Sequence, residues 1–319
     1  MPRERIDTTG QPFETTGVDF AGPLYVKPDN KKVYIALFTC AVTRAVHLEL
    51  VTDLSADAFL LAFRRFISRR GICNVIYSEN ARTFKRAEQD LKCLWNLMKG
   101  KEMQELFTEK RISWIYIVER AAWWGGMWER LMRPVKTCLR KMLGRSCLER
   151  EELDTLICEV EAVINSRPLT YLHTESNEPS PFTPAHFLTG QRITTLPSYP
   201  AHNSSMDKTN ATQLNRRWQY RQRLSNHFWN RWRRDYLMEL RSVHCMSNLN
   251  QSAPFKVGDV VLLHEDKQPK HMWKMGRIEE TFMGRDGKVR SCAVRLPSRL
   301  ILRRPIQLLY PLELDEHWT

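Results

Sequence analysis

The chain has 319 residues, of which 42% are hydrophobic and 10% aromatic, and its 49 Lys+Arg against 36 Asp+Glu give a formal net charge of +13. This composition is too apolar for a disordered chain, and the length suffices for about two domains with buried cores. The sequence has no run of about 18 apolar residues and no secretory signal pattern, so we expect a soluble, intracellular protein that is not secreted. The 8 cysteines occur singly, without a CxxC pair, and we interpret them as buried free thiols.

Strand and helix patterns follow one another in the first part of the chain. Three runs rich in β-branched and aromatic residues, 17–26, 32–42 and 45–51, are separated by turn residues and predict three consecutive antiparallel strands. Ser55 then precedes a run whose apolar residues recur at helical spacing as far as Gly71, which predicts a capped helix. The pattern therefore indicates a three-stranded meander followed by a helix.

Helices and strands continue to alternate up to about residue 167. The expected elements are a buried strand at 73–80, a helix at 86–110, a strand at 113–118 and helices at 125–145 and 151–167. A meander followed by this alternation indicates a mixed α/β layer fold. We place this first domain at residues 10–170.

The character of the chain then changes twice. Residues 171–206 are rich in Pro, Ser, Thr and Asn, and we interpret them as a linker that lies over the first domain. Residues 207–250 predict a helix rich in arginine and aromatic residues. Residues 254–314 have the short strands and turns that are typical of a small all-β barrel.

The positive charge is concentrated toward the C-terminus. From residue 200 onward there are 21 Lys+Arg and 12 Asp+Glu, a net charge of +9, which leaves +4 for residues 1–199. The helix at 207–250 contains Arg231, Arg233 and Arg234 among its arginines. Such an excess favours nucleic acid as the partner, although a merely basic surface would have the same composition. We predict that these three arginines contact DNA phosphates.

Three acidic residues occupy positions where a carboxylate is unusual. Asp19 lies in the middle of an apolar strand, Glu79 lies at the end of the strand VIYSEN, and Glu129 lies in the tryptophan-rich start of a helix. Carboxylates at such positions can meet at one cleft of an α/β fold, where their mutual repulsion is relieved by Mg²⁺ or Mn²⁺. This predicts a two-metal site acting on a phosphodiester, and isolated structural ion pairs are the simpler alternative.

Several long motifs occur in an order that points to one family. The runs PFETTGVDFAGPLYV, YSENARTFKRA, WIYIVERAAWWGGMWERLMRPVK and INSRPLTYL, followed by WKMGRIEETFMGRDGKVRSCAV and RRPIQLLYPLEL, resemble the integrases of LTR retrotransposons, most closely the BEL/Pao type. The resemblance extends from about residue 3 to residue 314 and includes the domain that follows the integrase core in those polyproteins.

The resemblance implies an RNase H-like core that holds two Mg²⁺ (or Mn²⁺) ions, trims the 3′ ends of element DNA and joins them to target DNA. Asp19, Glu79 and Glu129 stand at the positions of its three acids, and Arg133 and Lys136 stand where DNA-contacting residues are implied. For the two basic residues, a solvated helix face is the alternative. The resemblance also implies a homo-oligomer with element and target DNA as partners. The resemblance further implies that the protein is made in the cytoplasm, acts in the nucleus and has no membrane among its partners.

The sequence departs from the family pattern around the second acid. Glu79 stands in a Ser-Glu-Asn-Ala run where Asp and Gly are usual. One added methylene shifts the carboxylate by about an ångström or more, which can cost about a hundredfold in rate. Pro134, in the helix that carries Glu129, can also kink that helix. These departures favour impaired catalysis.

A His/Cys zinc module would normally precede the core. Only 18 residues come before Asp19, so we expect either a fragment of a longer polyprotein or a decayed or host-retained copy. The alternative to an integrase is therefore a catalytically dead DNA-binding or scaffold protein that keeps the fold.

Other candidate residues give weaker indications. For the tryptophans beside Glu129, core packing is the main interpretation and DNA-strand positioning the alternative. Four histidines have no metal-ligand spacing and are interpreted as surface or core residues; they are His47, His186, His227 and His264.

Overall fold

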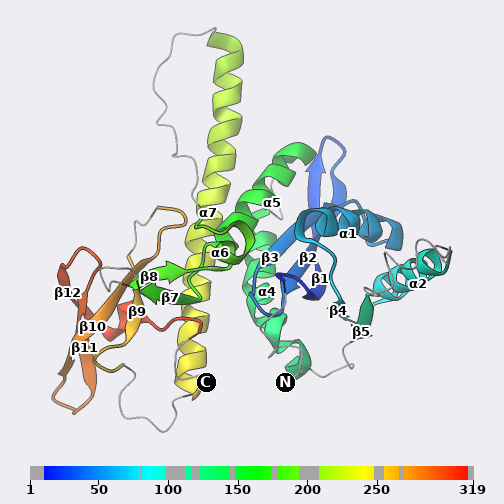
Figure 1. Cartoon of the computed structure of the whole chain (residues 1–319). Coiled ribbons are helices and arrows are strands. Elements are labelled where there is room, and N and C mark those ends of the chain that lie inside the picture. The colour runs from blue at the N-terminus through cyan, green and yellow to red at the C-terminus, as the bar shows by residue number, and fades with distance from the viewer. Residues whose placement is uncertain are drawn as a thin grey trace. The chain divides into compact units, whose positions relative to one another are not determined.

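The structure is a computed structural model, and it describes residues 11–79, 81–97, 112–116, 122–143, 148–173, 179–193, 208–247, 255–265 and 269–314. Figure 1 labels its elements where there is room. The chain forms two compact units, of which the first contains Met1–Ile164 and His202–Phe228 and the second contains Asn165–Ala201 and Trp229–Thr319. None of the helices in the described ranges is long and apolar enough to cross a membrane.

The first unit is built on a mixed sheet with the strand order β3-β2-β1-β4-β5. Its strands are β1 (Thr15–Lys27), β2 (Lys31–Cys40), β3 (Val46–Val51), β4 (Val75–Ser78) and β5 (Ser113–Tyr116), and the short β6 (Leu148–Glu149) pairs with β1. The first three strands are antiparallel, whereas β4 is parallel to β1 and to β5. This topology is that of an RNase H-like core, and it confirms the expected fold class.

Helices surround this sheet. They are α1 (Ala56–Arg70), α2 (Arg82–Leu97), α4 (Ala122–Leu143) and α5 (Arg150–Asn165). The Ser55 side chain accepts a hydrogen bond from the Ala58 backbone at the start of α1, and Gly71, with φ of 90°, ends it, as expected for these residue types. Helix α4 includes Pro134 and continues on both sides of it.

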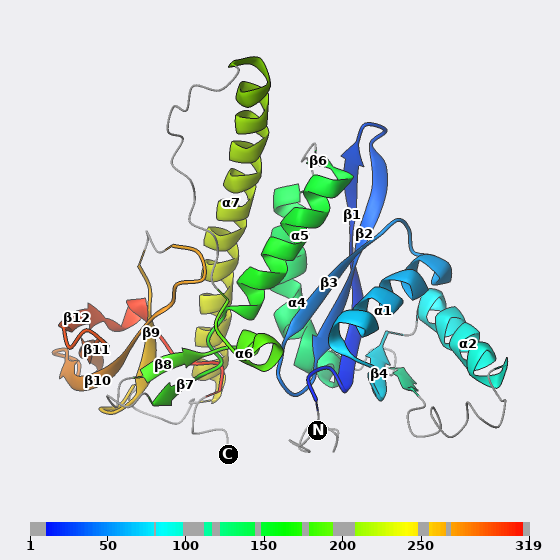
Figure 2. The same cartoon turned by 45° about the horizontal axis from the view of Figure 1, so that its top comes forward.

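Neighbouring residues of β1 face opposite sides of the sheet. Phe20 packs against Phe59 of α1 and Phe84 of α2, with ring centroids 5.9 and 5.0 Å away. Asp19 instead forms an ion pair with Lys136 of α4. Because successive side chains of a strand alternate, α1 covers one face and α4 the other, as can be followed in Figure 2.

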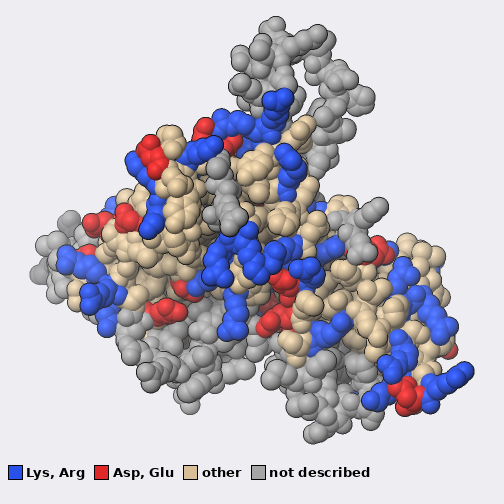
Figure 3. All heavy atoms as spheres, turned by 180° about the vertical axis from the view of Figure 1, so that it is seen from behind, with Lys and Arg blue, Asp and Glu red and all other residues tan. Residues whose placement is uncertain are grey.

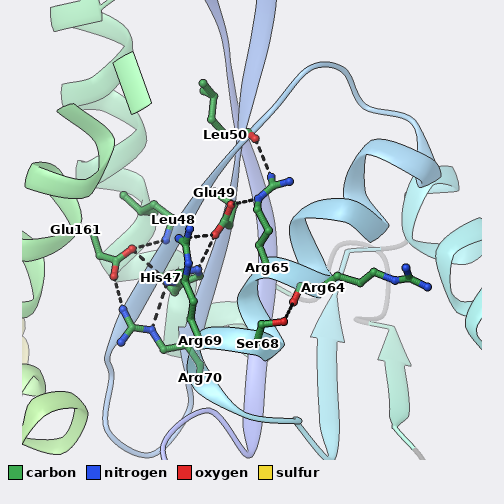
Figure 4. A network of polar contacts seen from close by, with 10 residues as sticks. All are labelled: His47, Leu48, Glu49, Leu50, Arg64, Arg65, Ser68, Arg69, Arg70 and Glu161. Atoms are coloured by element: carbon green, nitrogen blue, oxygen red, sulfur yellow. Dashed lines mark hydrogen bonds and ion pairs between the residues drawn. The ribbon is translucent and has the colours of Figure 1, made fainter. Parts of the chain in front are cut away.

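A buried network of charges ties β3 to α1 and α5 (Figure 4). His47 is 1% exposed, and its ring nitrogens Nε2 and Nδ1 lie 3.0 Å from Glu49 Oε1 and 3.3 Å from Glu161 Oε2. Arg65 and Arg70 of α1 pair with Glu49 and Glu161, respectively. Burial alone would lower the pKa of His47, but the hydrogen bonds to Glu161 and Glu49 outweigh burial and raise it. His47 is therefore a core residue that bridges two carboxylates.

The arginine-rich and aromatic segment forms one helix, α7 (Lys208–Ser247), of 40 residues, as expected. Its N-terminal part belongs to the first unit, where Arg217 pairs with Glu149 and Glu152 and Ser225 donates a hydrogen bond to Glu159. Its C-terminal part belongs to the second unit. There it buries a cluster of aromatic side chains that includes Trp229, Trp232, Tyr236 and Trp273.

The second unit contains an antiparallel sheet with the strand order β12-β11-β10-β9-β13. The strands are β9 (Val260–Leu263), β10 (Lys274–Met283), β11 (Val289–Arg295), β12 (Ile301–Pro305) and β13 (Leu309–Tyr310), with a 3-10 turn at Ile306–Leu308. The inner face carries Val261, Ile278, Cys292, Val294 and Leu309. This curled antiparallel sheet agrees with the small all-β domain expected at 254–314.

The segment 171–206, expected as a linker over the first domain, is different in its described part. It contributes to a hairpin of β7 (Thr170–His173) and β8 (Pro179–Phe182) and forms α6 (Pro184–Thr189), and it belongs to the second unit. Just before the hairpin, the fully buried Arg167 pairs with Glu313, and the Leu314 backbone bonds to that of Leu169. These long-range contacts order a segment whose elements are too short for periodicity to reveal.

Candidate functional site

Two of the three predicted acids lie next to each other on adjacent strands. Val18 of β1 is the register partner of Ser78 of β4 in the parallel pair, so Asp19 and Glu79 follow at matching positions. Asp19 is 9% exposed, whereas Glu79 is exposed at the end of β4. The parallel register therefore places both carboxylates at one location.

Both acids line a cavity of about 390 Å³. Residues Phe20–Gly22 of β1 form part of its wall, and the remaining lining comes from α4, through Met132, Arg133, Lys136, Thr137 and Arg140. The three basic residues are spaced by three and four positions, which places them on one face of the helix. The cavity thus combines two acidic and three basic side chains, a set that suits an anionic ligand such as a phosphate group.

Both oxygens of Asp19 have partners. Oδ2 accepts a hydrogen bond from Lys136 Nζ within the ion pair, and Oδ1 accepts one from the Phe20 backbone at 2.6 Å. The side chains of Asp19 and Lys136 are 13% and 32% exposed, so this ion pair is partly screened from water. Lys136, for which the family resemblance implies a DNA contact, is here the partner of the first acid.

The third predicted acid, Glu129, lies in α4, seven residues before Lys136. Two helical turns separate the two positions, so the backbone places Glu129 on the face of α4 that carries Lys136. The side chain of Glu129 lies outside the described residues, as do the side chains of the three neighbouring tryptophans, Trp123, Trp124 and Trp128. The structure therefore brings together Asp19 and Glu79 and fixes the helical position of Glu129.

The described donor set fits a hard divalent cation in part. Carboxylate oxygens are the ligands that Mg²⁺ and Mn²⁺ prefer, and Asp19 and Glu79 supply them in one cavity. Among the described side chains, no group of three His, Cys, Asp or Glu is close enough to hold a metal. The ammonium group of Lys136 at Oδ2 of Asp19 would repel a cation bound to the same carboxylate.

The three arginines predicted in α7 differ in their surroundings. Arg234 is exposed, with a side-chain exposure of 61%, and its closest acidic partner is Asp235 at 3.7 Å. Arg231 is half-buried. Arg233 is 4% exposed, donates to the Glu265 carbonyl at 2.8 Å and lies 5.5 Å from the Trp229 ring centroid. The prediction of a DNA contact is therefore not retained for Arg233, whose guanidinium group is used within the protein.

Basic side chains are spread widely over the surface. On the face drawn in Figure 3, Lys and Arg side chains are exposed at many places, with acidic side chains among them. In the C-terminal sheet, Arg303 of β12 lies over the Phe282 ring of β10, 3.8 Å from its centroid. The composition shows an excess of positive charge, and the fold places the residues that carry it on many different elements.

Comparisons with known proteins give one family and several structures. A family described as "Family of unknown function (DUF5641)" matches residues 216–312. No curated protein matches the chain.

Three of the similar solved structures are retroviral. A chain of the simian T-cell lymphotropic virus intasome, solved in complex with PP2A regulatory subunit B56 gamma, is 12% identical, with a TM-score of 0.37 over 95% of this chain and 79% of that one. The HTLV-2 integrase catalytic core domain in complex with magnesium is 18% identical, with a TM-score of 0.34 over 56% of this chain and 97% of that one. The catalytic core domain of BIV integrase is 14% identical, with a TM-score of 0.36 over 56% of this chain and 95% of that one. At such low similarity, the assignment of the fold rests on the strand order.

Proposed function

We propose that the chain is an integrase of the BEL/Pao type of LTR retrotransposon, which trims DNA 3′ ends and joins them to target DNA. The observation that carries this proposal is the placement of Asp19 and Glu79 in one cavity, faced by the basic side chains of α4. Acidic and basic side chains in that arrangement can hold a divalent cation and a phosphodiester at the same place. The order of the sequence motifs supports the same function.

Asp19, Glu79 and Glu129 would hold the metal ions, two Mg²⁺ or Mn²⁺. When bound, such ions activate a water molecule or hydroxyl group and stabilise the leaving oxygen of a phosphodiester. The basic residues on α4 have a different role. Arg133 is exposed at the cavity, where its guanidinium group can hold a DNA phosphate in two-point contact.

DNA would also be held outside the cavity. The exposed Arg234 and the half-buried Arg231 of α7 are candidates for phosphate contacts, which position DNA without reading its sequence. Element ends and target DNA would be the partners of a homo-oligomer, and the nucleus would be the site of action.

A second candidate function is a catalytically dead DNA-binding or scaffold protein. The presence of Glu79 at the second acid position favours it, because the longer side chain displaces the carboxylate by about an ångström or more and near-octahedral Mg²⁺ tolerates little displacement. The ion pair between Asp19 and Lys136 points the same way, since it occupies one oxygen of the first acid.

Nicking of supercoiled plasmid DNA tests the proposal without knowledge of the element ends. We expect the wild-type chain to convert supercoiled plasmid to relaxed circles in the presence of Mn²⁺, and Asp19→Asn, purified in parallel, to lose this activity. Nicking that persists in Asp19→Asn would come from another site or protein and would contradict the proposal. DNA binding without nicking, in both Mg²⁺ and Mn²⁺, would support the second candidate.

A further inference from the structure

We propose that Lys136 is an internal counter-ion of Asp19, which must move from the carboxylate to a DNA phosphate before a divalent cation binds, so that metal and DNA bind cooperatively. This inference rests on the proposed function, because it concerns the regulation of the same cavity. It predicts a binding property that can be measured apart from catalysis.

The first step is the occupancy of Asp19. Its Oδ2 accepts from Lys136 Nζ and its Oδ1 accepts from the Phe20 backbone, so the charge of the carboxylate is already balanced by an ammonium group. An ammonium group and a divalent cation at the same oxygen would repel each other strongly in a partly buried site. The ion pair therefore competes directly with the metal.

The second step is that the Lys136 side chain can turn toward a different partner in the same cavity. Its side chain is 32% exposed and lines the cavity, and its flexible four-carbon stem carries a compact charge that can turn toward an entering anion. Arg133 and Arg140 line the same cavity from the same helix face, and both side chains are exposed. A phosphate attracted by these two arginines would lie within the space that the Lys136 side chain can reach.

The third step is thermodynamic linkage. If DNA draws Lys136 from Asp19, it raises the affinity for metal, and metal must raise the affinity for DNA by the same factor. Without DNA, Lys136 keeps the affinity for metal low. Such a device would hold the site inactive until DNA is present.

The test measures Mn²⁺ affinity of the full chain by electron paramagnetic resonance of free Mn²⁺, with and without a DNA duplex. Without DNA, we expect Lys136→Gln to bind Mn²⁺ about tenfold more tightly than the wild type, a size typical of such couplings. Arg140→Gln is the matched control, since it removes a charge from the same cavity without removing the partner of Oδ2. Because that charge acts only at longer range, we expect an increase of at most about threefold.

The effect of DNA gives a second readout. In the wild type, DNA should raise Mn²⁺ affinity by about tenfold. In Arg140→Gln this increase should be smaller but still present, because Arg133 remains to attract the phosphate, and in Lys136→Gln it should largely disappear. Lys136→Arg, which keeps a positive charge that can pair with the carboxylate, should stay as weak in Mn²⁺ binding as the wild type. In a chain that already carries Asp19→Asn, adding Lys136→Gln should no longer change the Mn²⁺ affinity.

Equal Mn²⁺ affinities of Lys136→Gln and Arg140→Gln, or no Mn²⁺ binding by any variant, would overturn the inference. Failure of the proposed function is distinguishable from this. If Lys136→Gln tightens Mn²⁺ binding while no variant nicks plasmid, the counter-ion role stands and the catalytic function fails. If nicking depends on Asp19 while the two glutamine variants bind Mn²⁺ alike, the catalytic function stands and the counter-ion role fails.

Discussion

Val18 of β1 and Ser78 of β4 are register partners, and each is followed in the chain by a carboxylate that lines the same cavity. Side chains on neighbouring parallel strands at matching positions point to the same face of the sheet. Asp19 and Glu79 are thus juxtaposed by the pairing of two strands that lie about 60 residues apart in the sequence. This relationship makes the length of the second acid a critical variable.

Shortening Glu79 tests whether its added methylene impairs catalysis. Because a displacement of about an ångström can cost about a hundredfold, we expect Glu79→Asp to raise the rate of plasmid nicking by about ten- to a hundredfold in Mg²⁺. Glu79→Gln, which keeps the length but removes the charge, serves as the control and should lower the rate. A slower Glu79→Asp would show that the rest of the site is adapted to glutamate.

Arg233 and Arg234 are neighbours in sequence with different expected roles. Arg234→Ala should weaken DNA binding and reduce the slope of log affinity against log salt by about 0.9, the loss of one phosphate contact. Arg233→Ala should leave that slope unchanged and lower the free energy of unfolding by about 1–3 kcal/mol, because it leaves the Glu265 carbonyl without its donor. Binding titrations at several salt concentrations and urea denaturation of both variants measure the two effects. A reduced salt slope for Arg233→Ala together with a loss of stability for Arg234→Ala would contradict these two roles.

The buried pair of Arg167 and Glu313 should dominate the stability of the second unit. Arg167 is fully buried, and Glu313 also accepts a hydrogen bond from Tyr236 at 2.9 Å. Removing the cation would leave a nearly buried carboxylate without its charge partner, so we expect Arg167→Ala to lower the free energy of unfolding by about 3–5 kcal/mol. Arg285→Ala, in the exposed turn between β10 and β11, should change it by less than about 0.5 kcal/mol. Comparable effects of the two variants in urea denaturation would rule out a structural role for the ion pair.

The His47 network predicts a defined pH dependence of stability. The pKa of His47 is raised above 6.5, so its contribution is fully present below pH 6.5 and is lost as the pH rises through the folded-state value. Burial raises the pKa of Glu49, but hydrogen bonds from His47 and Arg65 outweigh it and hold the pKa below 4.5. The contribution of Glu49 is therefore present above pH 4.5 and is lost as the pH falls through its folded-state value.

We therefore expect the free energy of unfolding of the wild type, relative to His47→Gln, to decrease as the pH rises above 6.5 and through the folded-state pKa of His47. Denaturation of both proteins at a series of pH values measures this difference. The groups facing His47 are Glu49 and Glu161, which favour its charged form, and Arg70, which opposes it. A difference that is independent of pH, or that grows with pH, would be inconsistent with a charged His47.

Much of the fold could be predicted from local sequence patterns. Ser55 and Gly71 mark the ends of α1 because caps act through neighbouring backbone groups. The hairpin and short helix within 171–206 could not be predicted, because they are stabilised by contacts such as Arg167 with Glu313, 146 residues apart. Local periodicity reveals elements that are long and amphipathic, and it does not reveal those that depend on distant partners.

The sequence predicts which residues belong to the site, but it does not predict which of them pair with each other. The sequence singled out Asp19 and Lys136 separately, as an acid and as a DNA contact, yet their ion pair depends on α4 packing on the face of β1 opposite Phe20. The arginine content of α7 likewise does not distinguish the buried Arg233 from the exposed Arg234. Helical spacing could have done so, because Arg233 lies four residues after Trp229 and three before Tyr236, on the apolar face of the helix. Burial is set by tertiary packing, and the amino-acid composition does not reveal it.

The covalent joining of DNA by the chain tests the central claim most directly. A labelled duplex with free 3′-hydroxyl ends is incubated with plasmid, Mn²⁺ and either wild type, Glu79→Asp or Asp19→Asn, and labelled plasmid is counted after denaturing electrophoresis. We predict labelled plasmid with the wild type, more of it with Glu79→Asp and none with Asp19→Asn. Label that joins equally well with Asp19→Asn, or that joins with none of the three proteins, would contradict the assignment of an integrase site to this cavity.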